Sequence, residues 1–209
     1  MRSILPFVFR RLVLCPLLAL PLLAQPVPST AAPLLADPAA YVAREFGSSF
    51  KLDPKVPPMF GDLDGDGTQD VVLVGRSNSP LTAQEQMAFK VEDPYDAYFG
   101  TGDPRITSQF TLHFDGSARC ILIVFDWRRP SQAKPKSKQV SKYVLINTPF
   151  ETIGLVNLRL KRRSKIQKFQ AIETVDRDTV HALIFWDGKR WRWRAQGMEG
   201  DETLMPPPR

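Results

Sequence analysis

Cysteine and histidine are scarce in this sequence, and their scarcity limits the kinds of site it can form. The 209 residues include two cysteines and two histidines. Cys15 lies in an N-terminal apolar stretch, and once that stretch is removed Cys120 remains alone, which excludes an internal disulfide. Cys120 opens the apolar run 120–125, so we expect a buried core side chain rather than a nucleophile or a metal ligand.

Recognisable catalytic motifs are also lacking. The sequence has no Gly-x-Ser-x-Gly, no His-Glu-x-x-His and no phosphate-binding glycine loop. His113 and His181 stand in strand patterns, with no candidate nucleophile in a recognisable motif beside them. We therefore do not expect an enzyme, although a small exported hydrolase with an unrecognised site stays open as an alternative.

Residues 1–32 have the three zones of a secretory signal and spacer. Three arginines precede an apolar stretch over residues 12–24, and small and turn-forming residues continue to Ala32. The apolar stretch is shorter than the ~20 residues of a membrane-spanning helix, and two prolines interrupt it. We expect cleavage after Ala24 or Ala32, export to the periplasm or the extracellular space, and no transmembrane segment in the mature chain.

The charge balance is mildly basic. Lys and Arg number 28 against 22 Asp and Glu, and loss of the three leader arginines leaves 25 against 22, about +3. This balance argues neither for nor against nucleic acid. The 43% hydrophobic and 24% charged residues are typical of a folded globular protein with a core of ordinary size.

After the leader, the pattern predicts one early helix. Asp37 supplies an N-cap before Pro38 for a helix over residues 38–46, and Gly47 ends it. Two further short helices are expected, one opened by a capping box at Thr82 and Glu85 and one begun by Asp93 and Pro94.

Hairpin signals dominate the rest of the chain. Asp-Gly pairs at 115–116 and 187–188 stand between strand-like runs, which is the strongest short-range signal for a hairpin. The expected strands cover residues 71–74, 106–114, 119–125, 143–147, 153–160, 165–172, 183–186 and 190–193. We expect a basic loop at 128–139.

These signals predict an α+β fold that is mostly antiparallel β. We expect one compact domain of β-hairpins over residues 36–197, with one to three short helices. The segment 198–209, which has three consecutive prolines before its last residue, is expected to be a disordered tail.

One dense motif points to a metal. Residues 61–70 place carboxylates at alternating positions on a chain that must turn at its glycines. Ca²⁺ accepts six to eight oxygen ligands at ~2.4 Å, whereas an uncompensated group of four carboxylates would be repulsive. The expected ligands of a structural Ca²⁺ are the carboxylates of Asp62, Asp64, Asp66 and Asp70 and the backbone carbonyl of Thr68.

The surroundings of the motif decide its type. An EF-hand needs a glutamate at its twelfth position, which here is Leu73, and a helix afterwards, where this chain is strand-forming. Residues 60–74 resemble instead the FG-GAP or VCBS type of repeat, in which a Phe-Gly-Asp-x-Asp-x-Asp-Gly-x-x-Asp loop leads into an apolar strand. Segments 93–100, 144–151 and 185–188 resemble small secreted bacterial proteins of this type, which implies no activity.

In that family several copies of the repeat build the blades of a β-propeller. This sequence has one copy, because the Asp-Gly pairs at 115–116 and 187–188 lack the other carboxylates. A full propeller is therefore not expected.

Basic residues provide the remaining functional candidate. Two tryptophans alternate with arginines near residue 192, and we expect them to point inward as core while the polar face points outward. An anionic envelope polymer, lipid headgroups or another protein would be the partner, since export makes nucleic acid unlikely. The possible anion-binding surface comprises Arg159, Lys161, Arg162, Arg163, Lys165, Arg190, Arg192 and Arg194.

The sequence thus indicates an exported, Ca²⁺-stabilised, non-enzymatic module with a structural or binding role. The alternatives are the small hydrolase and the binder of anionic envelope polymers.

Overall fold

Two β-branched, apolar strands form the centre of the larger sheet. They are β3 (Asp70–Arg76) and β5 (Arg119–Val124), and every residue of both is buried except Arg76 and Arg119. The structure is a computed structural model that describes residues 35–101, 103, 105, 119–128, 140–162, 165–177, 180–196 and 204–205. Strands buried on both faces read as continuous apolar runs, and this explains why residues 71–74 show no polar alternation.

This larger sheet, sheet A, has the strand order β1-β3-β5-β6-β4, with β2 also paired to β3. Its pairs are antiparallel except for β4 with β6, which is parallel. The remaining strands of sheet A are β1 (Lys51–Leu52), β2 (Met59–Gly61), β4 (Lys90–Glu92) and β6 (Lys142–Leu145).

A second sheet, sheet B, is antiparallel throughout, with the order β10-β9-β8-β7-β11. The Asp-Gly turn at 187–188 joins β9 to β10 as predicted, and Asp187 accepts hydrogen bonds from the N–H groups of Lys189 and Arg190. The strands are β7 (Thr152–Arg162), β8 (Lys165–Val175), β9 (His181–Trp186), β10 (Trp191–Ala195) and β11 (Leu204–Met205).

The described part of the chain has three short helices, α1 (Pro38–Phe46), α2 (Gln84–Met87) and α3 (Pro94–Tyr98). The bounds and caps of α1 are as predicted, because the Asp37 carboxylate accepts the Ala40 N–H and Gly47 follows the helix. Asp93 likewise caps α3. The predicted capping box of α2 is wrong: Ala83 occupies the N-cap position and no side chain caps that helix.

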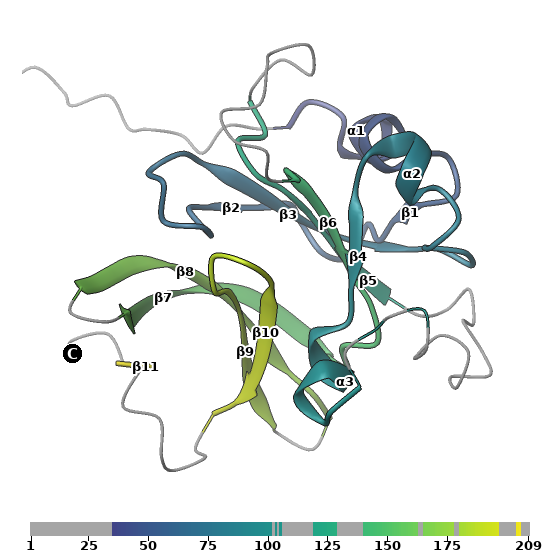
Figure 1. Ribbon diagram of the computed structural model, residues 1–209. Helices are drawn as coiled ribbons and strands as arrows, with labels where there is room; N and C mark the ends of the chain where they lie inside the picture. Colours follow the sequence, from purple (N-terminus) through teal and green to yellow (C-terminus); the bar gives the residue numbers. More distant parts are fainter. Residues whose placement is uncertain are drawn as a thin grey trace, which may run out of the picture. The chain divides into compact units, whose positions relative to one another are not determined.

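Layers of helix, sheet A and sheet B follow one another (Figure 1). Alternate residues of β3 point to opposite sides, so that Val71 and Leu73 pack in a core with the α1 residue Phe46. Val72 and Val74 belong to the core between the two sheets. That core also includes Ile172, Ile184, Trp186 and Trp191.

The predicted fold class is confirmed: the domain is α+β and mostly antiparallel, and it is not a propeller. The division of the strands into two stacked sheets was not part of the prediction. None of the helices in the described part has the length and apolar content needed to cross a membrane.

Several predictions fall on residues outside those described. They concern the leader, the strand at 106–114 with its Asp-Gly turn, and most of the basic loop at 128–139. Within the expected tail, Leu204 and Met205 pair with Leu160 and Arg159 of β7, and the rest of that segment is outside the described residues.

Candidate metal centre

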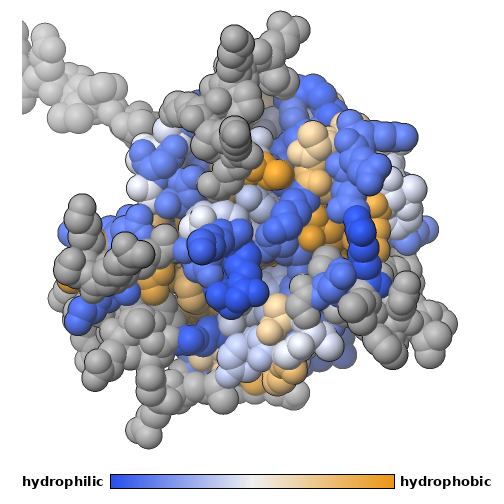
Figure 2. Space-filling model, viewed as in Figure 1, coloured by the Kyte–Doolittle hydropathy of each residue, from blue (hydrophilic) through white to orange (hydrophobic). Residues whose placement is uncertain are grey.

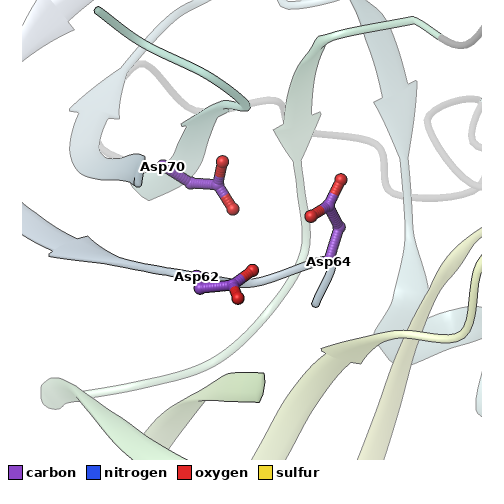
Figure 3. Close-up of side chains that lie close together, drawn as sticks. All are labelled: Asp62, Asp64 and Asp70. Atoms are coloured by element: carbon purple, nitrogen blue, oxygen red, sulfur yellow. The ribbon is translucent and has the colours of Figure 1, made fainter. Parts of the chain in front are cut away.

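Three of the four aspartates in the motif face one shared space. The motif forms the loop between β2 and β3, which are antiparallel neighbours in sheet A. One carboxylate oxygen from each of Asp62, Asp64 and Asp70 lies within 4.8 Å of the others. Figure 3 shows the three carboxylates directed toward this space. The spacing suits oxygen ligands arranged around a single cation.

Main-chain amides shape the loop around Asp62. The two oxygens of its carboxylate accept the N–H groups of Gly65 and Gly67, at 2.8 and 3.0 Å. Gly65 and Gly67 have φ values of +80° and +84°, a left-handed conformation that glycine adopts without steric cost. The glycines of the motif therefore allow the chain to fold back over its first carboxylate.

Asp70 is fully buried at the start of β3. One of its carboxylate oxygens accepts the Leu63 N–H at 2.8 Å, and the other accepts the Asp126 N–H at 2.9 Å. Asp126 follows β5 and has φ +55°, so its amide is presented from a different strand of sheet A. Asp70 thus joins both ends of the loop to the end of β5.

Burial and mutual repulsion disfavour ionisation of these carboxyl groups. The pKa of Asp70 is raised to about 8, first by burial and then by the charges of Asp64 and Asp62. The pKa of Asp64 is raised to about 6, again mainly by burial, with further contributions from Asp66, Asp62 and Asp126. A cation placed among these groups would remove the repulsion and favour their ionised forms.

Asp66 is the one predicted carboxylate ligand that lies outside this group. The Asp66 carboxylate is exposed and lies outside the group of three, and one of its oxygens accepts both the Thr68 N–H and the Thr68 hydroxyl. The loop therefore brings Asp62, Asp64 and Asp70 together and leaves Asp66 engaged within its own turn.

Two neighbours of the loop, Asp126 and Gln170, were not predicted from the sequence. The N–H of Gln170, in β8, donates to the carbonyl of Asp62 at 2.6 Å. A Cβ added to Gly61 would lie 2.0 Å from the Gln170 side-chain oxygen, so a larger residue at this position would have to displace the end of the Gln170 side chain. In Figure 1 the loop between β2 and β3 lies against the long β7–β8 hairpin. No local pattern signals either contact, because both partners are distant in sequence.

The predicted basic residues fall in two separate places. Arg159, Lys161, Arg162 and Lys165 belong to β7 and β8, and Arg163 is outside the described residues. Arg190 precedes β10, whereas Arg192 and Arg194 lie in it. Figure 2 shows hydrophilic and apolar residues interleaved on the face of the molecule that is turned toward the viewer in Figure 1.

The tryptophans of β10 are core residues, as predicted. Trp191 is 1% exposed and Trp193 is 8% exposed. Between them, Arg192 is exposed, and its Nε donates to the Asp187 carboxylate at 2.6 Å. The β10 strand therefore has no open tryptophan surface on which a ligand could stack.

Cys120 is a core residue, also as predicted. It is 1% exposed, and burial raises the pKa of its thiol to about 12. Such a thiol is inert as a nucleophile at neutral pH.

No family model matches the chain, and neither a curated protein nor a solved structure matches it significantly.

Proposed function

We propose that this chain is an exported module without catalytic activity, and that its 62–70 loop binds one Ca²⁺ that stabilises the fold. The observation that carries the proposal is the convergence of the Asp62, Asp64 and Asp70 carboxylates within 4.8 Å of one another. The likeness of residues 60–74 to the FG-GAP or VCBS type of repeat supports the same metal.

The donor set favours Ca²⁺ among the common metals. The three converging groups are all carboxylates, which suit hard cations and not Zn²⁺ or Cu²⁺. Mg²⁺ requires a strict octahedron and retains its waters, whereas Ca²⁺ accepts the irregular geometry of a flexible loop. Main-chain carbonyls of the loop and solvent would complete the six to eight oxygens that Ca²⁺ takes.

Stabilisation would come from the position of the loop between the two sheets. Through Asp70 the loop is bonded to the end of β5 in sheet A, and through the Asp62 carbonyl it is bonded to β8 in sheet B. A cation bound by these aspartates would restrain both the contact with β5 and the contact with β8. Extracellular modules hold Ca²⁺ with Kd values of about 10⁻⁴–10⁻³ M, so 1 mM Ca²⁺ would add roughly 0.4–1.4 kcal/mol.

Asp64→Asn gives the sharpest test of the metal. The asparagine keeps an oxygen to accept the Asp66 N–H and removes one charge from the repulsive group. We expect a higher Tm than the wild type in chelator and a smaller rise in Tm on adding Ca²⁺, with weaker binding by calorimetry. Glu85→Gln, an exposed charge on α2, is the matched control and should change neither quantity.

The metal proposal fails if calorimetry detects no Ca²⁺ binding and the wild-type Tm is the same in chelator and in millimolar Ca²⁺. A loop of this composition would then be an acidic turn.

Export is supported by the basic, apolar and small-residue zones of residues 1–32. Mass analysis of protein recovered from outside the cytoplasm should find a new N-terminus at Gln25 or Pro33. Recovery of the chain with Met1 intact would contradict cleavage.

A further inference from the structure

The register of the β7–β8 hairpin gathers cations on one face near its end. Arg159 stands directly opposite Lys168, and Lys161 stands directly opposite Ile166. Because side chains of a strand alternate between faces, all four belong to one face, which we call the cationic ribbon. Lys161, Ile166 and Lys168 are exposed, and Arg159 is half-buried. The hairpin is the long pair of strands beside the β2–β3 loop in Figure 1.

The ribbon is unfavourable for the stability of the hairpin. Like charges directly opposite one another on adjacent strands are destabilising. Among the described residues, no carboxylate lies within the 4.0 Å ion-pair distance of Arg159, Lys161 or Lys168. By contrast, Arg192 on β10 is held by Asp187. No ion pair among the described residues therefore accounts for the placement of these three cations.

Ile166 indicates what kind of anion fits the ribbon. Its side chain is 53% exposed although it lies on the same face as the cations. A bilayer surface takes up both features, because basic groups meet anionic headgroups while an apolar side chain enters the boundary with the acyl chains. A hydrated polysaccharide would compensate the charges and leave Ile166 in water.

We propose that the cationic ribbon, formed by Arg159, Lys161, Ile166 and Lys168, is a docking surface for anionic phospholipid membranes. This proposal is independent of the metal. The four residues lie on β7 and β8, and every binding experiment can be carried out in chelator. Each basic residue near an anionic surface contributes about 1 kcal/mol to binding, so three give an affinity increase on the order of 100-fold.

The test is co-sedimentation of the full chain with vesicles in chelator at low ionic strength. Vesicles of phosphatidylcholine with phosphatidylglycerol should bind the chain, and vesicles of phosphatidylcholine alone should report any contribution of the apolar leader. The combined Arg159→Gln, Lys161→Gln and Lys168→Gln variant should lose affinity for the anionic vesicles on the order of 100-fold. Higher salt should weaken wild-type binding.

A matched variant separates the ribbon from net charge. Lys51→Gln, Lys55→Gln and Lys189→Gln remove three exposed cations elsewhere and should leave vesicle binding near the wild-type value. Ile166→Ser should weaken binding to anionic vesicles severalfold and leave binding to dextran sulfate unchanged. Circular dichroism would check that each variant is folded.

Three outcomes would overturn the proposal. In the first, the ribbon variant binds anionic vesicles as tightly as the wild type. In the second, the wild type binds dextran sulfate but not the vesicles, which would assign the ribbon to a soluble polyanion. In the third, the vesicles bind only after Glu199, Asp201 and Glu202, which precede β11 in the sequence, are replaced by glutamine. The ribbon would then be occupied by the chain's own acidic residues.

Discussion

The metal loop and the cationic ribbon concentrate opposite charges in neighbouring parts of the molecule. The charged side chains of the two regions differ in the contacts that they make. In the loop, the carboxylates of Asp62 and Asp70 each accept two main-chain N–H groups. In the ribbon, Arg159 stands opposite Lys168, with no ion pair to either among the described residues. The carboxylates of the loop are thus hydrogen-bonded within the fold, whereas the opposed cations of the ribbon repel one another across the hairpin.

The comparison also shows two ways in which a sequence places charge. The loop aspartates are neighbours in the chain, and glycines with positive φ turn them toward one space. The ribbon cations are up to nine residues apart and meet only because β7 and β8 pair in one register. A one-residue slip of that register would move Lys168 to the opposite face from Arg159.

Asp70→Ala should have the largest effect on stability. It leaves the N–H groups of Leu63 and Asp126 without their acceptor in a buried place, while it removes an unfavourable buried carboxyl group. We expect a net loss of about 2 kcal/mol in chelator, together with loss of the Ca²⁺ response. Urea unfolding with and without Ca²⁺ measures both. An Asp70→Ala protein as stable as the wild type would mean that the hydrogen bonds of Asp70 do not hold the loop.

The stability of the metal-free protein should depend on pH through the loop. Asp70 and Asp64 have folded-state pKa values of about 8 and about 6, above their ordinary value of 3.8. The folded state therefore binds more protons than the unfolded state between about pH 4 and pH 8, and the free energy of unfolding falls as pH rises through this window. Asp93, with a pKa raised to about 6 by burial, contributes in the same direction.

Calcium should reverse the part of this dependence that belongs to the loop, because it binds the ionised carboxylates. We expect the unfolding free energy in chelator to be higher at pH 6 than at pH 8, and the gain from millimolar Ca²⁺ to be larger at pH 8. Urea unfolding at the two pH values measures both quantities. A chelated protein that becomes more stable from pH 6 to pH 8 would contradict the raised pKa values.

Lys168→Glu should have the smallest effect on stability, and that effect should be an increase. It places an opposite charge across from Arg159 and should raise the unfolding free energy by about 0.5 kcal/mol, while it weakens binding to anionic vesicles. Lys168→Gln removes the repulsion without adding an attraction and should give about half of that gain. A loss of stability in Lys168→Glu would indicate that the ribbon is already compensated.

Local signals were the ones that could be read correctly from the sequence. Asp37 and Gly47 bound α1, and the Asp187-Gly188 pair joins β9 to β10, because caps and tight turns depend on a few consecutive residues. The prediction of a capping box at Thr82 is wrong, although it also rested on a local pattern. Its chemistry was compatible with a helix start, but the chain begins α2 after Ala83 without that cap.

Within the candidate site, the sequence alone determined which carboxylates are available and that the glycines turn the chain around them. Whether all of them converge was decided by the tertiary structure. It gathers Asp62, Asp64 and Asp70, whereas the Asp66 carboxylate accepts a hydrogen bond from the Thr68 N–H. The contacts that hold the loop, from Asp126 and Gln170, lie 56 and 108 residues along the chain from Asp70 and Asp62. Alternation along one strand gives the faces of its side chains, but strand register and sheet packing arise from long-range burial. For that reason only the folded structure could place the acidic loop against the β7–β8 hairpin.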